Sequence, residues 1–470
     1  MRLTVEVFVA ADEFDVIVIG MGPGGERVAG QLALAGLAVA GVESGLVGGE
    51  CPYYGCVPSK MMIRAANLLA EARRIPGMAG QASVDPSWAP VAMRIRDEAT
   101  DDWDDTVAAD RFAGQGGHLY RGQGVITAPG QVTVGDDVLR ARRGIVIATG
   151  SSPAIPPIPG LAGTPYWTNR EAVKATDIPQ SLAVLGGGAI GVELAQVFAR
   201  FGAQVSVVEG LGRLLPAEEP EAGQLVAGAF QAEGIGVRTG VTASQVRYAD
   251  GAFTVTLADG TALTPTNMLV ATGRRADLAA VGAGAVGIDE NARFVPVDDR
   301  MRAGPGVWAI GDVAGHGMFT HVAVYHADIV IADVLGRQHH RADHRAVPRV
   351  TFTDPEVASV GLTEAQARDQ GMDVRIGLAQ VPASARGWIH KAGNHGFIKL
   401  IEDAASGLLA GATSAGPVGG EVLSMLTLAV QARVPVARLR EMIYAYPTFH
   451  RAVEDALAVL ADHAELPQAD

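Results

Sequence analysis

Cysteine is almost absent from this sequence: its 470 residues include two, Cys51 and Cys56. One pair this close together could not brace so long a chain, and a chain of this length builds large cores without disulfides. The scarcity favours a reducing compartment, by default the cytoplasm, and thiols that are placed for redox chemistry. The alternative is a pair of buried cysteines that serve only packing.

Long apolar runs and surplus positive charge are also missing. The longest uncharged apolar run, residues 28–42, is broken by Gly30 and Gly36 and falls short of the ~18–20 residues that a bilayer crossing requires. Residues 1–14 do not combine a basic start with a long apolar core, so they do not indicate a signal peptide. The formal net charge of −14 argues against a nucleic-acid partner. We therefore expect a soluble protein with no membrane insertion and no bound nucleic acid.

Glycine, by contrast, is abundant, and its first cluster follows a short apolar strand at residues 15–19. A helix is predicted from 26 to 35 and a second strand from 38 to 42, which ends at an acid. This order is the βαβ dinucleotide fingerprint: the glycines make the turn, let a pyrophosphate approach the helix and allow close packing, and the acid receives a ribose hydroxyl. A purely structural glycine turn is the alternative. The candidate cofactor-binding residues are Gly20, Gly22, Pro23, Gly25 and Glu43.

The same pattern returns about 166 residues later, with strands at 182–185 and 205–208 and a helix at 192–201. A duplicated fingerprint implies two dinucleotides, or a nucleotide plus the adenine end of a flavin. An acid at the end of the second strand accepts a ribose 2′-hydroxyl and repels a 2′-phosphate, so NADH is favoured over NADPH, although Arg213 is placed to soften this preference. The candidates are Gly186, Gly188, Gly191 and Glu209.

Other candidates lie at the ends of predicted strands and beside the cysteines. A helix predicted from 57 to about 75 starts directly after Cys56, where the helix dipole favours a thiolate. Further along the chain, residues 88–112 are predicted to be helical and residues 351–360 to form a strand. Three strands end in short polar motifs, at the carboxyl edge where α/β sheets bind ligands. For the aspartate of the third motif, the alternative is a cap on the following helix. The strand-end candidates are Ala148, Thr149, Gly150, Gly273, Gly311 and Asp312.

Taken together, these residues resemble the FAD-dependent pyridine-nucleotide disulfide oxidoreductases, which include glutathione reductase, dihydrolipoamide dehydrogenase and mercuric reductase. The resemblance runs from Asp15 to Leu457, and its most specific part is Cys51 and Cys56 followed by Pro58, Ser59 and Lys60. It implies an α/β fold with two Rossmann-like domains and a C-terminal α+β dimerisation domain. The implied division is 1–155 and 280–345 for the FAD domain, 156–279 for the NAD(P) domain and 346–470 for the dimerisation domain.

The resemblance also implies the chemistry. The first fingerprint and Gly49 would hold FAD, Asp312 would contact its ribityl chain, and the second fingerprint would hold NADH in preference to NADPH. Electrons would pass from NADH through FAD to a Cys51–Cys56 disulfide and on to a small-molecule acceptor: a disulfide, a quinone or a metal ion. Cys51 would meet the acceptor, Cys56 would lie against the flavin, and Lys60 would pair with Glu193. The protein would be a homodimer, and no resident metal is expected.

The C-terminal segment departs from the family pattern. Tyr446 stands where related enzymes carry the acid/base histidine, and Arg451 stands where a glutamate would orient it. A phenol is a poor base at neutral pH. One explanation is a displaced base, His450, oriented by Glu454, which would keep a dihydrolipoamide dehydrogenase activity. The other is an acceptor that needs no such proton transfer.

The sequence departs from the family pattern at two further positions, and it leaves one non-enzymatic function open. Glu50 replaces the usual threonine and puts an acid near the flavin, and Ala189 replaces a gating tyrosine, which would open the nicotinamide pocket. Mercuric reductase also needs a C-terminal cysteine pair, which is missing here, whereas transhydrogenases usually lack the second cysteine that Cys56 provides. A non-enzymatic alternative is a flavoprotein subunit docked in a larger complex.

Overall fold

The computed structural model describes residues 12–465, so residues 1–11 lie outside it. The described chain divides into two compact units. The first comprises residues 12–58, 93–154 and 274–344, and the second comprises 59–92, 155–273 and 345–465. The chain first passes from the first unit to the second within α3 (Cys56–Arg74).

The first unit is built on an eight-stranded sheet whose centre is parallel. The order β16-β17-β6-β1-β2-β3 places β1 between β6 and β2, as expected for a doubly wound sheet, and the β4-β5 hairpin extends from β6. The strands are β1 (Asp12–Ile19), β2 (Val39–Glu43), β3 (His118–Arg121), β4 (Gly124–Ala128), β5 (Gln131–Val134), β6 (Asp137–Ile147), β16 (Arg302–Gly304) and β17 (Val307–Ala309). A short pair, β7 (Ser152–Pro153) and β15 (Arg274–Arg275), is antiparallel.

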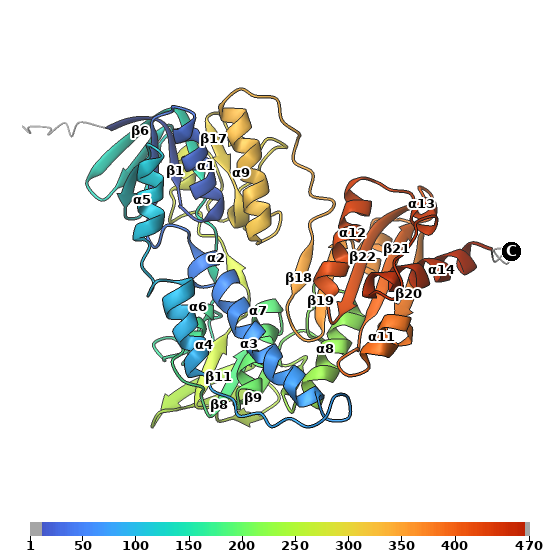
Figure 1. The fold of residues 1–470 in the computed structure, drawn as a ribbon. Helices are drawn as coiled ribbons and strands as arrows, with labels where there is room; N and C mark the ends of the chain where they lie inside the picture. Colours follow the sequence, from blue (N-terminus) through green and yellow to red (C-terminus); the bar gives the residue numbers. More distant parts are fainter. Residues whose placement is uncertain (1–11, 466–470) are drawn as a thin grey trace, which may run out of the picture. The chain divides into compact units, whose positions relative to one another are not determined.

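The two faces of β1 are buried in different cores because successive side chains of a strand point to opposite sides. Val16 and Val18 pack with residues of α1 (Pro23–Leu34) and α9 (Thr320–Val334), which lie side by side in Figure 1. Ile17 and Ile19 pack on the other side with the β4–β6 strands. This unit also contains α2 (Glu50–Tyr53), α5 (Thr106–Gly114), the π-helical turn η1 (Ile95–Ala99) and the 3-10 turns η2 (Ala283–Val286) and η3 (Gly311–Ala314).

The second unit contains three sheets, the first of which is parallel, with the order β10-β9-β8-β14. A three-stranded antiparallel sheet, β11-β12-β13, accompanies it. The elements are α4 (Ala89–Arg94), α6 (Asn169–Val173), β8 (Ser181–Leu185), α7 (Ala189–Arg200), β9 (Gln204–Glu209), α8 (Pro220–Ala232), β10 (Gly236–Thr239), β11 (Ala243–Ala249), β12 (Ala252–Leu257), β13 (Ala262–Leu263) and β14 (Asn267–Val270).

The remaining sheet of the second unit is antiparallel, with the order β18-β19-β22-β21-β20. Residues of its helices α12 and α14 share one apolar core with residues of β19, β21 and β22. The elements are β18 (Arg349–Thr351), β19 (Glu356–Gly361), α10 (Glu364–Asp369), β20 (Val374–Gln380), η4 (Val381–Ala383), α11 (Ala385–His390), β21 (Phe397–Asp403), β22 (Leu408–Gly416), α12 (Gly419–Gln431), α13 (Val436–Arg440), η5 (Phe449–Arg451) and α14 (Ala452–Glu465).

Two local predictions were wrong. The sequence favoured one strand over 351–360, but β18 ends at Thr351 and β19 begins at Glu356, because Pro355 has no N–H for a sheet and residues 352–354 bond to helices instead. Residues 88–112 were expected to be helical throughout. They instead break between η1 and α5, where Asp101, Asp102 and Trp103 have positive φ. Among the helices of residues 12–465, none is both long and apolar enough to cross a bilayer.

Candidate active site

The first glycine fingerprint forms a tight turn with an open side. A Cβ on Gly20 would lie 2.4 Å from the carbonyl oxygen of Ala148, and one on Gly25 would lie 1.9 Å from that of Gly20, so both positions exclude a side chain. Around Gly22 a Cβ would meet no atom within 4 Å. This open side borders the first turn of α1, which begins at Pro23 and has no side-chain cap.

The second fingerprint repeats this geometry in the other unit. A Cβ on Gly186 would lie 2.3 Å from the carbonyl oxygen of Ala271, and one on Gly191 would lie 2.0 Å from that of Gly186. Gly188 again faces open space, and α7 again starts without a side-chain cap. In each unit, therefore, a helix N-terminus and a side-chain-free turn face space that suits a pyrophosphate.

Each fingerprint ends on a glutamate that holds its own loop. Glu43 accepts hydrogen bonds from the backbone N–H groups of Met21 and Gly45, both at 2.7 Å. Glu209 accepts from Gly187 at 2.6 Å and from Leu211 at 2.7 Å. These bonds fix each carboxylate at the end of the second strand, beside the glycine turn, where a ribose would lie.

The cysteine segment is attached to the first fingerprint by glycines. Gly48 and Gly49 both have positive φ, and a Cβ on Gly49 would come within 2.9 Å of the Gly22 Cα. Cys51 lies in α2 and is half-buried, whereas Cys56 is exposed. The glycines thus allow the cysteine segment to approach the turn of the first fingerprint.

Cys56 is the first residue of α3, one residue before the predicted helix start at Val57. The Thr320 hydroxyl lies 3.4 Å from the Cys56 sulfur, within reach of a sulfur hydrogen bond. The positive end of the helix and this hydroxyl both favour a thiolate at Cys56.

Lys60, one turn further along α3, forms an ion pair with Glu193 of α7. Its ammonium lies 2.8 Å from the Glu193 Oε2, and the side chain of Glu193 is buried. The other carboxylate oxygen, Oε1, accepts the backbone N–H of Phe352 at 2.8 Å. The structure therefore brings Lys60 and Glu193 together.

A polar chain connects the strand-end residues of the first unit. The Ser151 hydroxyl donates to the Asp312 carboxylate at 2.5 Å, and Arg274 donates to the Ser151 hydroxyl at 2.8 Å and to its carbonyl at 2.6 Å. Glu50 lies 3.6 Å from the Arg274 guanidinium. Burial raises the pKa of Asp312 and the Glu50 charge adds to this rise, against the lowering effects of the Ser151 hydrogen bond and of Arg274.

The remaining strand-end residues form turns. Ala148 and Thr149 line the back of the Gly20 turn, and Gly150, Gly273 and Gly311 all have positive φ. Asp312 lies inside the turn η3, and α9 begins only at Thr320, so Asp312 does not cap that helix as the alternative had it.

At the C-terminal segment the geometry does not support the displaced base. Glu454 pairs with Arg451 at 3.0 Å, and the His450 Nε2 lies 3.5 Å from the Thr448 hydroxyl. His450 also lies in the 3-10 turn η5, two residues before α14 begins, so the two side chains do not share the predicted helix. Tyr446 is 70% exposed, and the Arg451 guanidinium lies 5.4 Å from its ring centroid.

The fold and these residues define an enzyme class with two dinucleotide sites and a cysteine pair. Residues 14–327 match the model of the pyridine nucleotide-disulphide oxidoreductase family, and residues 347–457 match the dimerisation domain of the same family. The chain therefore belongs to the pyridine nucleotide-disulphide oxidoreductases, which confirms the resemblance and the fold class.

The relatives and the solved structure that are most informative here are named as oxidoreductases. The chain is 34% identical to a mercuric reductase of Acidithiobacillus ferrooxidans, over 93% of this chain and 80% of that protein. It is also 34% identical to a dihydrolipoyl dehydrogenase of Chlorobaculum tepidum, over 95% and 97%. The fold is similar to that of the HOCl-induced flavoprotein disulfide reductase RclA from Escherichia coli in a Cu(II) complex, with a TM-score of 0.84, 25% identity and coverage of 95% and 99%. The protein is thus an enzyme, and its family supports FAD as cofactor.

Sequence reasoning missed several residues that contact the predicted ones. Ser151 and Arg274 follow the two Ala-Thr-Gly motifs directly, and this repeated placement was a signal that could have been used. Thr320 and Phe352 had no such signal, because they contact Cys56 and Glu193 across 264 and 159 residues of chain.

Proposed function

We propose that this enzyme uses NADH to reduce a disulfide formed by Cys51 and Cys56 and passes the electrons on to a small-molecule acceptor. The observation that carries this proposal is the position of Cys56, at the first residue of α3 and 3.4 Å from the Thr320 hydroxyl. FAD, when bound, supplies the two-electron relay between nicotinamide and thiol. Reduction of the disulfide consumes two electrons and two protons and yields two thiols. The acceptor then takes up these two electrons and two protons, and the disulfide forms again.

The first fingerprint, with Gly20, Gly22, Gly25 and Glu43, suits the adenosine diphosphate half of FAD. The open side at Gly22 leaves room for the pyrophosphate, and Glu43 lies where the ribose would bind. Asp312 would hold a ribityl hydroxyl. Its carboxylate already accepts the Ser151 hydroxyl on Oδ2, which fixes its orientation.

NADH rather than NADPH is the proposed reductant. The Glu209 carboxylate would accept a ribose hydroxyl and repel a 2′-phosphate. Arg213, which the sequence suggested as a softening charge, donates to the carbonyl oxygens of Pro216 and Glu218 at 2.9 and 3.1 Å. Steady-state kinetics with both nucleotides tests this preference, and a kcat/KM for NADPH equal to that for NADH would overturn it.

A homodimer through the C-terminal domain completes the proposal, in a reducing compartment such as the cytoplasm. The family's dimerisation domain supports it. So do large apolar side chains exposed on that domain, Ile443 at 95% and Trp388 at 76%, since such surfaces are commonly covered by a partner. Sedimentation of the purified protein measures the assembly directly.

An anaerobic titration with NADH tests the central step. A thiolate against oxidised flavin gives a long-wavelength absorbance band, and we expect this band in the NADH-reduced wild type. The Cys51→Ser variant, which cannot form the disulfide, should show it without NADH, and the Cys56→Ser variant should show it under no condition. Persistence of the band in Cys56→Ser would sink the assignment.

The acceptor is to be identified by steady-state comparison of lipoamide, small disulfides, quinones and metal ions. Hg(II) and Cu(II) belong in the set because one relative is named a mercuric reductase and the similar structure of RclA is a Cu(II) complex. The exposed Tyr446 in place of a histidine favours an acceptor that needs no strong base. If lipoamide reacts rapidly, His450→Ala decides whether His450 takes part: an unchanged rate excludes it.

A further inference from the structure

The segment between β18 and β19, residues 352–354, leaves its sheet and bonds to the helices that carry the Lys60–Glu193 ion pair. Phe352 donates its backbone N–H to Glu193 Oε1 at 2.8 Å, while Lys60 holds Oε2 at the same distance. The Lys60 ammonium also lies 4.7 Å from the centroid of the Phe352 ring. Both oxygens of a buried carboxylate are thus fixed, one by a lysine and one by this segment.

Gln196, three residues after Glu193 on α7, holds the next part of the segment. Its side-chain carbonyl accepts the backbone N–H of Asp354 at 2.8 Å, and its amide donates to the backbone carbonyl of Asp354 at 2.9 Å. The side chain of Gln196 therefore satisfies both backbone groups of Asp354, as a neighbouring strand would. Because residues three apart lie on one helix face, Glu193 and Gln196 hold Phe352 and Asp354 from the same side.

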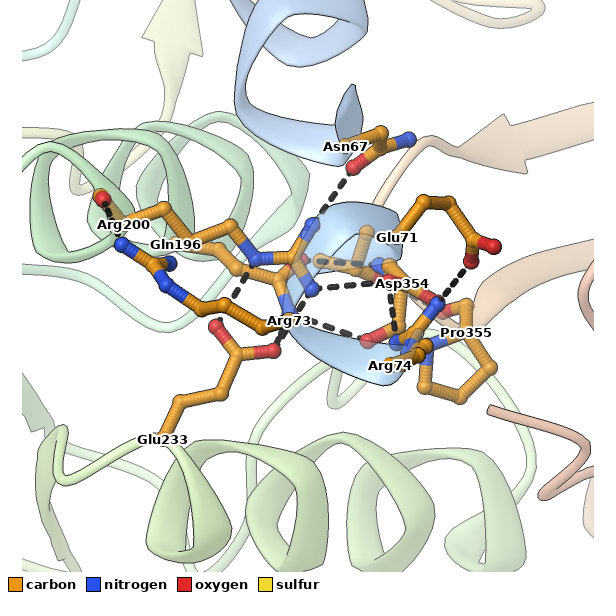
Figure 2. A network of polar contacts seen from close by, with 10 residues as sticks. Asn67, Glu71, Arg73, Arg74, Gln196, Arg200, Glu233, Asp354 and Pro355 are labelled. Carbon is orange, nitrogen blue, oxygen red and sulfur yellow. Dashed lines mark hydrogen bonds and ion pairs between the residues drawn. The ribbon is translucent and has the colours of Figure 1, made fainter. Parts of the chain in front are cut away.

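The Asp354 carboxylate forms ion pairs with two arginines, as Figure 2 shows. Arg74, from the end of α3, lies 2.6 Å from Oδ2, and Arg200, from the end of α7, lies 2.8 Å from the same atom. Arg200 is 3% exposed and also binds Glu233 at 2.6 and 2.9 Å and Asn67 at 2.6 Å. We call Arg74, Gln196, Arg200 and Asp354 the Asp354 clamp.

The clamp is a buried charged interaction, because Arg200 is both charged and almost fully buried. Burial alone would lower the pKa of Arg200, but Glu233 and Asp354 raise it above its ordinary value, so the guanidinium stays charged. A charge this deeply buried needs its partners, and leaving it unpaired is costly. The positions of Glu233 and Asp354 are therefore tightly specified.

The clamp and the ion pair occupy the same faces of the same helices. On α3, Lys60, Asn67 and Arg74 are seven residues apart, a spacing that repeats one face. On α7, Glu193 and Gln196 are followed by Arg200. Each helix thus meets the 352–354 segment at its start through the ion pair and at its end through the clamp.

We propose that the 352–354 segment positions the Lys60–Glu193 pair, and that the Asp354 clamp sets where the Phe352 N–H lies. The inference rests on the proposed function in one respect, that the pair serves electron entry from NADH. Phe352 and Asp354 act as positioning residues, because they touch the pair and the helices rather than substrate. The domain that the family uses for dimerisation would then contribute directly to the orientation of Lys60.

Two measurements on the FAD-loaded full chain report on the position of the Phe352 N–H and on the Lys60–Glu193 pair, and neither requires NADH. The first is hydrogen exchange of the peptide that contains Phe352, because its N–H bond to Glu193 protects that amide. The second is the rate of acylation of Lys60, because its side chain must leave the Glu193 carboxylate to reach the reagent. The chain has four lysines, Lys60, Lys174, Lys391 and Lys399, so each site can be followed separately by mass spectrometry.

The variants are Asp354→Asn, which keeps the shape and removes the charge, and Arg74→Gln, which removes one arginine. The matched control is Glu71→Gln, because Glu71 also pairs with Arg74 but not with Asp354. In both clamp variants we expect Phe352 exchange and Lys60 acylation to rise about fivefold, the size expected for a weakened hydrogen bond. Lys399, which is buried elsewhere, should keep its rate, and Glu71→Gln should match the wild type.

Flavin reduction by NADH adds a functional measurement. We expect the clamp variants to lower the reduction rate while the KM for NADH stays unchanged, a split that general destabilisation would not give. Should Asp354→Asn fail to fold, Arg74→Gln, at a half-buried position, carries the same comparison. Folded variants with wild-type exchange and acylation would overturn the positioning role. If the wild type itself fails to be reduced by NADH, the proposed function fails, and exchange and acylation still decide this inference.

Discussion

The Nε2 atoms of His326 and His344 lie 2.8 Å apart, so one ring must donate a proton to the other. The backbone N–H of Gly311 donates to His326 Nδ1 at 3.2 Å, which leaves the His326 proton on Nε2 and makes His344 Nε2 the acceptor. Both rings are therefore neutral. Burial, reinforced by His344 and His316, lowers the pKa of His326 to about 3, and burial together with the stacked His316 lowers that of His344 to about 4.

This pair predicts a loss of stability on acidification. Between the ordinary histidine pKa near 6.5 and the lowered folded values, the unfolded chain binds more protons than the folded one, so the free energy of unfolding falls as pH falls through this window. Each histidine contributes about 1.4 kcal/mol per pH unit. Urea unfolding from pH 7 to pH 4.5 should show the slope, and His344→Gln should reduce it by about half. The exposed His339→Gln is the control, and an equal slope in His344→Gln would contradict the assignment.

The fingerprint glycines give a second prediction, because two of them look equivalent in sequence but not in space. Gly191→Ala places a Cβ 2.0 Å from the Gly186 carbonyl and should destabilise the protein by about 2 kcal/mol or more. Gly188→Ala meets no atom within 4 Å, so its melting temperature should match the wild type. Its methyl group would occupy the pyrophosphate space, and the KM for NADH should rise about tenfold or more. An unchanged KM in Gly188→Ala would place the nucleotide elsewhere.

How far the sequence could predict this structure depends on how local each signal is. The two fingerprints, the start of α3 at Cys56 and the acids Glu43 and Glu209 follow from patterns within about thirty residues of chain. The partners of Glu193 and Asp312 do not, because Phe352 and Ser151 lie 159 and 161 residues away and carry no periodic pattern. Reading 351–360 as a single strand hid the segment that reaches Glu193. The expectation that His450 is helical paired His450 with Glu454, but in the structure Glu454 forms an ion pair with Arg451.

A third prediction concerns Lys399 of β21, which is 3% exposed and contacts three carboxylates. Its ammonium lies 2.8 Å from Glu219, 2.8 Å from Glu221 and 2.9 Å from Glu364. Lys399→Met would leave the buried Glu219, and the partly exposed Glu221 and Glu364, without this cation and should cost about 3–5 kcal/mol at pH 7. Lys399 holds the pKa of Glu364 below its ordinary value of 4.5, so the loss should shrink as pH falls below 4.5. Lys174→Met, at an exposed lysine, controls for the change of residue type, and a Lys399→Met loss that stays constant with pH would contradict the electrostatic cause.

The fourth prediction concerns Glu50, the residue before Cys51, and it rests on the proposed redox role of the cysteines. Glu50 lies 3.6 Å from Arg274, which in turn binds the Ser151 that holds Asp312. The Glu50 charge raises the pKa of Asp312, so removing it should lower that pKa. It also adds negative charge next to a sulfur that must accept electrons.

Glu50→Gln should therefore make the enzyme easier to reduce. Loss of the carboxylate removes a repulsion toward the added electrons and frees the Arg274 charge to act on the same region, so both effects have one sign. We expect the two-electron reduction potential to become more positive by about 30 mV, equivalent to roughly 1.4 kcal/mol. Equilibration with a redox dye measures it, and Glu98→Gln, an equal charge change at an exposed position, is the control. A shift of the same size in both variants would mean that net charge, and not the place of Glu50 beside Cys51, sets the potential.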